Sequence, residues 1–139
     1  MVAMTPVDDA ARCPCLSGLP WGECCGPLLR GEHAAPTAER LMRSRYSAFV
    51  VLDAAYLLGT WHPSTRPAEL ELDAGTRWFR LDVVRTEAGG PLDDRGVVEF
   101  EARHRGPDGA EVLHETSRFV RQRAGGPERR WLYVDGVVA

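Results

Sequence analysis

Four cysteines near the start of the chain are the residues whose type and spacing could support chemistry. They form two pairs, Cys13-Pro14-Cys15 and Cys24-Cys25, with eight residues between the pairs and no cysteine later in the chain. Cysteine thiolates are common ligands of Zn²⁺, and four of them complete the tetrahedral sphere of a structural zinc site. A disulfide within either pair would close a very small ring, and pairing between the pairs suits an oxidising compartment. The spacing therefore favours one zinc ion held by Cys13, Cys15, Cys24 and Cys25.

Two other interpretations of the cysteines stay open at this stage. The thiols could remain free or form a redox pair, or His33 could replace one cysteine as a ligand. Arg12 and Arg30 flank the cluster, and their charges could offset the charge of about −2 on a zinc ion with four thiolates. A catalytic zinc keeps one position open for water, whereas four thiolates fill the sphere. We therefore expect a structural zinc and no catalytic residue.

The sequence around these cysteines resembles a known zinc-binding motif. The runs CPCLSG at residues 13–18 and CCG at residues 24–26 are similar to the SEC-C motif, a zinc knuckle named after the C-terminal tail of the SecA translocation ATPase. Leu16 stands where this motif usually has Gly and Leu19 where Lys is common, and neither position is a ligand. The resemblance implies contact with a protein partner, such as the SecB chaperone or a ribosome surface.

Later stretches of the chain resemble the YchJ-type family of small uncharacterised bacterial proteins. They are LMRSRYSAF at 41–49, WHPSTRP at 61–67, SRFV at 117–120 and WLYVDG at 131–136. This resemblance implies a fold similar to nuclear transport factor 2 (NTF2-like), in which a curved sheet wraps around helices. The implied domain covers residues 36–139.

Composition divides the chain into three parts. Residues 1–11 are predicted to form a flexible leader, and the Cys-, Gly- and Pro-rich residues 12–35 form the SEC-C type zinc knuckle. Residues 36–139 hold nearly all of the periodic apolar pattern, enough for a core of their own. At 139 residues, the chain has room for one ordinary domain with a short appendage.

The first part of this domain carries the period of helices. Pro36 and Thr37 mark the start of a helix whose apolar stripe extends to Val50. Asp53 is expected to cap a second, shorter helix that ends near Trp61, because the residue before Pro63 avoids helical geometry. Both helices are predicted to be amphipathic, with one face toward a core.

The second part changes to the alternating period of strands. It predicts four strands, at residues 76–86, 96–105, 110–123 and 130–138, separated by Gly- and Pro-containing turns. In the first strand, Phe79, Leu81 and Val83 stand at alternate positions, so they are expected to share one apolar face. Helices followed by strands predict an α+β fold, in which N-terminal helices pack on a curved four-stranded antiparallel sheet.

The cone shape implied by the family resemblance keeps a second function open, an enzyme or ligand binder for a small molecule. We expect Arg45, Tyr46, Trp61 and His62 at such a pocket. A buried Arg45 would need an acidic partner. The candidates are Glu99, Glu101 and Asp135. Because the sequence contains no Gly-x-Ser-x-Gly or His-Glu-x-x-His motif, we favour a binding module over an enzyme.

Apolar residues in the knuckle suggest a contact surface. The knuckle is too small to bury all of its large apolar side chains, which are Leu19, Trp21, Leu28 and Leu29. We expect Leu19 and Trp21 to form a surface for a protein partner. The alternative is that they dock the knuckle against the larger domain.

Charge and hydropathy limit the other partners. The net charge of −3 argues against electrostatic binding of nucleic acid or of an anionic membrane. No stretch approaches the roughly 20 apolar residues that a membrane-spanning helix needs. The first residues lack the apolar run of a secretory signal, and clustered cysteines suit a reducing compartment, so we expect a cytoplasmic protein. The sequence does not define an oligomeric state.

Overall fold

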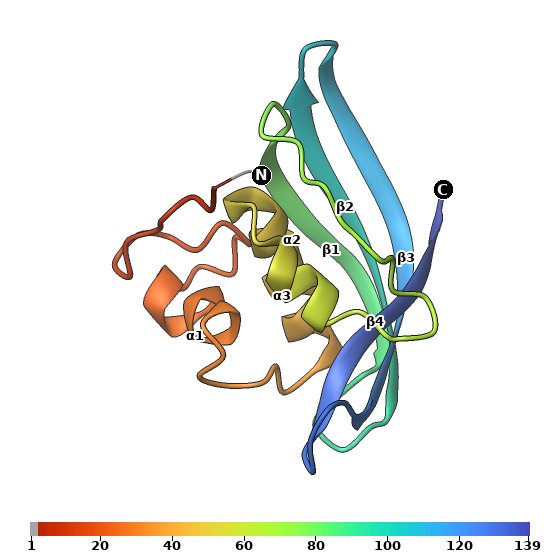
Figure 1. Cartoon of the computed structure of the whole chain (residues 1–139). Helices are drawn as coiled ribbons and strands as arrows, with labels where there is room; N and C mark the ends of the chain where they lie inside the picture. Colours follow the sequence, from red (N-terminus) through yellow and green to blue (C-terminus); the bar gives the residue numbers. More distant parts are fainter. Residues whose placement is uncertain (1–2) are drawn as a thin grey trace.

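Helices and one curved antiparallel sheet form two layers (Figure 1). The structure is a computed structural model that describes residues 3–139. In chain order its elements are the 3₁₀ helix η1 (Trp21–Glu23), the helices α1 (Cys25–Leu29), α2 (Ala38–Val51) and α3 (Ala54–Gly59), and the strands β1 (Arg77–Ala88), β2 (Arg95–Gly106), β3 (Gly109–Arg123) and β4 (Arg129–Val138). The predicted α+β arrangement is therefore confirmed.

The sheet is a meander in which each strand pairs with the next one along the chain. Its order is β1-β2-β3-β4, and all three pairings are antiparallel. A two-residue turn between Gly106 and Gly109 joins β2 to β3, and Gly109 has a φ of 105°, a conformation that favours glycine. The strand ends lie within two residues of those predicted, because the alternating pattern marks them locally.

The inner face of β1 differs from the prediction. Register shifts lie between Trp78 and Arg80 and between Val83 and Arg85, so the strand carries extra residues that interrupt its alternation. Leu81 is buried as expected, but Phe79 is 49% exposed. Trp78 takes the inner position instead, with its ring 6.3 Å from that of Tyr46 on α2. The prediction for Phe79 was wrong because a bulge changes which side chains face the core.

The two longer helices begin at the capping residues that the sequence predicts. The Thr37 hydroxyl accepts a hydrogen bond from the Arg40 amide at 3.1 Å, and the Asp53 carboxylate accepts one from the Tyr56 amide at 3.0 Å. Leu52, with a φ of 65°, ends α2 in the left-handed conformation. Within residues 3–139, no helix combines the length and the hydropathy that crossing a membrane requires.

Helix α2 lies between the cysteine-containing segment and the sheet (Figure 1). It contacts α1 on one side and β1, β2 and β4 on the other. One hydrophobic cluster includes all four cysteines together with Leu41, Met42 and Tyr46 of α2 and Phe119 and Trp131 of the sheet. The knuckle thus shares its packing with the larger domain.

Residues 3–11, which the sequence predicts to be part of a flexible leader, form hydrogen bonds along much of their length. The Thr5 amide donates to the carbonyl of Val51 at 2.8 Å, at the end of α2. Further on, the Trp21 amide donates to the carbonyl of Ala11 at 2.7 Å. From Thr5 onward, this segment therefore differs from the expected leader, because its backbone pairs with both the knuckle and α2. Residues 1–2 of that leader lie outside the described residues.

Candidate metal centre

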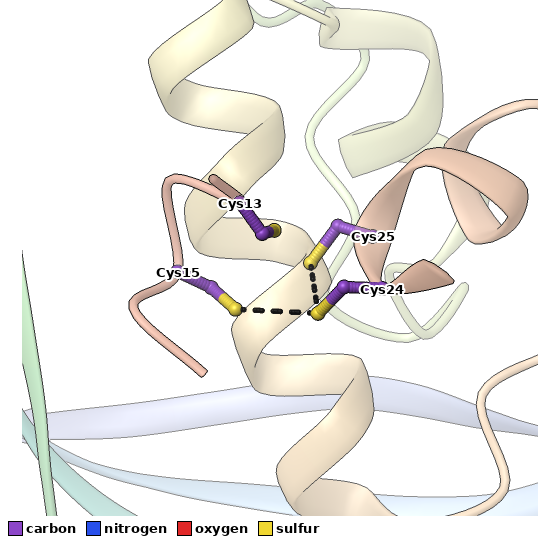
Figure 2. A group of neighbouring side chains, drawn as sticks. All are labelled: Cys13, Cys15, Cys24 and Cys25. Carbon is purple, nitrogen blue, oxygen red and sulfur yellow. Dashed lines mark hydrogen bonds between the residues drawn. The ribbon is translucent and has the colours of Figure 1, made fainter. Parts of the chain in front are cut away.

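The four cysteine side chains converge between the knuckle loop and α1 (Figure 2). Cys13 and Cys15 come from the loop, Cys24 precedes α1 and Cys25 is its first residue. All four are buried, and their Sγ atoms lie within 4.8 Å of one another. The predicted ligands are thus brought together in space.

The sulfur separations fit a tetrahedral metal site. The Sγ atoms of Cys15 and Cys24 are 3.6 Å apart, and those of Cys24 and Cys25 are 3.9 Å apart. A zinc ion with four Zn–S bonds of about 2.3 Å would place its sulfurs about 3.8 Å from one another. A disulfide would need about 2.05 Å, and all four cysteines are free. The donor set therefore fits a tetrahedral cation better than a disulfide pair.

The knuckle backbone turns tightly to aim these sulfurs. The Leu16 amide donates to the carbonyl of Cys13 at 3.1 Å, and Leu16 itself has a φ of 63°. On the other side, Gly26 packs so closely that a Cβ there would lie 2.7 Å from the carbonyl oxygen of Trp21. Leu16 tolerates the left-handed conformation at a cost, whereas Gly26 is required by this close approach.

The ionisation of the thiols also points to a cation. Interaction with the Cys13 side chain lowers the pKa of Cys15, which favours a thiolate at this sulfur. Interaction with Cys13 and Cys15, together with burial, raises the pKa of Cys25. Buried negative charges this close together repel one another, and a divalent cation among the sulfurs would offset that repulsion.

Two arginines of α2 add positive charge to the cluster. Arg40 donates from Nη1 to the Sγ of Cys24 at 3.3 Å and from Nη2 to the carbonyl of the same residue at 3.3 Å. Arg43 donates to the carbonyl of Cys15 at 2.8 Å. Such groups around the ligands offset the negative charge of thiolates and hold the ligands in place.

These two arginines differ from Arg12 and Arg30, which the sequence predicts for this role. Arg30 instead pairs with Asp9 at 3.1 Å and with Glu32 at 2.5 Å on the surface, and Arg12 is exposed. Spacing of three residues does place Arg40 and Arg43 on one side of a helix. Only the docking of that helix shows which side faces the cysteines.

Two further sequence expectations in the knuckle need correction. His33, the alternative ligand, is exposed and lies outside the group of four sulfurs. Trp21, expected on a partner surface, is only 6% exposed and belongs to the hydrophobic cluster that the knuckle shares with the domain, so it is not available to a partner. Leu19 is 43% exposed and remains available at the surface.

Three of the four residues expected at a pocket line the same cavity. Arg45, Tyr46 and Trp61 are part of the wall of a space of about 300 Å³ between the helices and the sheet. His62 does not line it; its Nδ1 lies 2.7 Å from the Ser64 hydroxyl, within the turn that follows α3. Pro63 begins that turn.

Arg45 forms no ion pair with any of the three acidic candidates. Glu99 pairs with Arg85 and His114, and Asp135 pairs with Arg118. Glu101 lies 3.6 Å from Arg103. These carboxylates all have other partners, so the expectation for Arg45 was wrong.

The fold and the cysteine site together define a SEC-C motif protein with an NTF2-like domain. A family model described as "YchJ, middle NTF2-like domain" matches residues 37–136. The chain belongs to this YchJ family, which confirms the family resemblance and the fold that it implied.

Relatives of known sequence and solved structure are similar over most of the chain. A UPF0225 protein of Ralstonia nicotianae is 54% identical over 91% of this chain and 90% of its own length. A UPF0225 protein of Corynebacterium efficiens is 49% identical over 96% of this chain and 98% of its own length. The crystal structure of a SEC-C motif containing protein from Psychrobacter arcticus superposes with a TM-score of 0.75 at 30% identity, over 94% of this chain and 84% of that one. The solution structure of a SEC-C motif containing protein from Rhodopseudomonas palustris also superposes with a TM-score of 0.75. It is 33% identical, and the match covers 92% of this chain and 98% of that one.

Proposed function

We propose that this protein binds one structural Zn²⁺ through Cys13, Cys15, Cys24 and Cys25. The observation that carries the proposal is the convergence of four buried sulfurs within 4.8 Å of one another. Four thiolates would fill the coordination sphere, so the ion would hold the knuckle together and would not activate water. Tetrahedral sulfur sites hold zinc or iron, and the choice of zinc rests on the cytoplasmic, structural role that we expect.

The test of this proposal is the metal content of the purified protein. We expect one zinc per chain by elemental analysis and less than a tenth of that in the Cys24→Ser variant. Leu19→Ser changes an exposed residue of the same loop and serves as the control, which should keep its zinc. Protein without zinc, or with iron in its place, would overturn the proposal.

The second part of the proposal is that the knuckle surface contacts a protein of the translocation or ribosome machinery. Leu16 and Leu19 are each 43% exposed on the loop between the two cysteine pairs. Leu16 has a backbone conformation that favours glycine, yet it carries a bulky apolar side chain. Because that side chain is exposed, packing within the folded chain does not explain why an apolar residue stands there. Resemblance to the SecA tail supports a protein partner for this surface.

This part is tested by direct binding, with purified SecB in a pull-down and with bacterial ribosomes in co-sedimentation. We expect one of these partners to retain the intact protein and to lose the Leu16→Ser/Leu19→Ser double variant, whose zinc content should be unchanged. If neither partner binds, or if the double variant binds as well as the intact protein, the surface has no such role. The zinc proposal stands apart from this result.

A further inference from the structure

The cavity between α2 and the sheet has an apolar wall and one positive end. Its volume is about 300 Å³, at the lower end of the range for small-molecule sites. The apolar side chains of the wall are Met42, Phe49, Trp78, Phe100, Leu113 and Phe119. Such a wall favours a ligand with a hydrophobic body.

Arg45 is a buried cation whose positive charge has no carboxylate partner. It is 7% exposed, and no ion pair joins it to a carboxylate within residues 3–139. Its Nη1 donates to the carbonyl of Leu57 at 2.8 Å and to the hydroxyl of Thr60 at 2.7 Å. The rings of Trp61 and Tyr133 lie 5.0 and 4.6 Å from its Cζ. Burial lowers the pKa of Arg45 to about 10, so the guanidinium stays charged at neutral pH.

The other hydrogen-bonding groups of the wall are also short of acceptors. Within residues 3–139, the Tyr46 hydroxyl and the Trp61 Nε1 are buried and have no hydrogen-bond partner. The remaining Arg45 nitrogens, Nε and Nη2, donate to no protein acceptor in the same part of the chain. The Tyr46 and Trp61 atoms are closed off by protein, whereas Nε and Nη2 of Arg45 are not, so an acceptor on a ligand would complete the hydrogen bonds of the guanidinium.

The carboxylate of the wall is already occupied by protein donors. Oε2 of Glu115 accepts a hydrogen bond from the Ser117 hydroxyl at 2.5 Å and another from the Tyr133 hydroxyl at 3.3 Å. Tyr133 therefore presents its hydroxyl to Glu115 and its ring to Arg45. The charge of Glu115 acts on the Arg45 guanidinium across the cavity, but the two side chains form no ion pair. Nε and Nη2 of Arg45 are therefore the donors of the wall that remain without an acceptor.

We propose that this cavity binds a small organic acid, with its carboxylate at Arg45 and its apolar body against the aromatic wall. A guanidinium matches a carboxylate with two parallel hydrogen bonds, and Nε and Nη2 of Arg45 are the two nitrogens left to form them. A cavity of about 150 Å³ holds one benzene molecule, so the volume here limits the body to about two rings. This site is separate from the metal centre and does not depend on the zinc proposal.

The experiment compares each acid with its neutral amide. Benzoate, indole-3-acetate and 2-naphthoate are titrated calorimetrically into the full chain beside benzamide, indole-3-acetamide and 2-naphthamide. We expect at least one acid to bind with an affinity at least tenfold above its amide. Equal binding of acid and amide would overturn the role of Arg45. No binding by any of the six at millimolar concentration would overturn the site.

Two variants locate the binding. Arg45→Gln should abolish the difference between acid and amide, whereas Arg80→Gln, which removes an exposed positive charge from β1, should keep it. Because loss of a buried guanidinium can unfold the chain, Ala102→Met provides a second test. Ala102 lines the cavity from β2, and a longer side chain there fills the space while Arg45 stays. Binding that survives Ala102→Met in folded protein would place the ligand elsewhere and overturn the proposal.

Discussion

Residues other than the four cysteines contact the sulfurs of the candidate metal centre. Arg40 reaches the Sγ of Cys24 from α2 at 3.3 Å, and the Ser17 hydroxyl lies 3.1 Å from the same sulfur. Each contact is available to a negatively charged thiolate and stabilises it in a buried site. Metal affinity at this site is therefore expected to depend on residues that are not ligands.

The first prediction concerns Arg40. Arg40→Gln removes the charge that contacts Cys24, and we expect the zinc affinity to fall by about 10–100-fold. The measurement is competition with a chromophoric chelator of known zinc affinity. Arg30→Gln is the control, since Arg30 pairs with Asp9 and Glu32 on the surface. Equal affinities of the two variants would contradict the role of Arg40.

The second prediction concerns the close contact at Gly26. In Gly26→Ala, the new Cβ would approach the Trp21 carbonyl oxygen, a backbone atom, at 2.7 Å, so the knuckle must shift. We expect the free energy of unfolding to fall by about 1–3 kcal/mol. Urea titration followed by circular dichroism measures it. Gly59→Ala in α3 meets no atom within 4 Å and should be neutral or slightly stabilising; a similar loss there would contradict the explanation.

At the scale of elements, α2 serves both candidate sites with different faces. Arg40, Arg43 and Ser47 face the cysteines, and the spacing of three and four residues keeps them on one side. Arg45 and Tyr46 lie on the side that lines the cavity. The helix thus contacts the knuckle with one face and the cavity and sheet with another.

The third prediction concerns an ion pair between β3 and β4. Arg118 and Asp135 lie opposite each other in the register and form two hydrogen bonds of 2.6 Å, which lower the pKa of the Asp135 carboxyl. A lowered folded-state pKa contributes stability above the ordinary value of 3.8, and this stability is lost as the pH falls through the folded-state pKa. Asp135→Asn should therefore lower stability near pH 7 and leave it nearly unchanged at low pH.

Thermal unfolding between about pH 2 and pH 7 measures this difference, which we expect to be small because both side chains are exposed. Asp108→Asn, in the turn between β2 and β3, is the control for the loss of one carboxylate. An equal effect of both variants, or an effect of Asp135→Asn that grows toward low pH, would contradict the pairing argument.

For the whole molecule, the shared core implies that the knuckle and the larger domain are coupled. The cysteines are in the same hydrophobic cluster as Leu41 and Trp131, yet the paired strands have contacts of their own. Loss of a metal would take away the bonds that hold the knuckle and would uncover one face of α2. The sheet would keep its backbone hydrogen bonds.

The fourth prediction is the result of chelation. Structural zinc supplies about 10–16 kcal/mol of apparent binding energy, so removal of the metal should unfold the knuckle and lower the melting temperature of the remaining chain. In hydrogen exchange, amides of residues 12–30 should exchange rapidly after chelation, while those of Val98 and Phe100 in β2 stay protected. Loss of protection in β2 as well would show that knuckle and sheet unfold as one unit.

The sequence by itself determined the features that depend on near neighbours in the chain. Helix caps at Thr37 and Asp53 act within three residues, and the alternation of the strands marks their ends within two residues. The candidate metal ligands also follow from spacing, because the two cysteine pairs are close enough in the chain to converge on one point.

Only the tertiary structure decided what depends on docking between distant segments. The burial of Trp21, the contacts of Arg40 and Arg43 with the knuckle and the unpaired charge of Arg45 follow from how α2 lies between the cysteines and the sheet. Phe79 turned outward because of a bulge in β1. A periodic pattern predicts that a side chain faces the core, but the residues it contacts there depend on packing across the whole molecule.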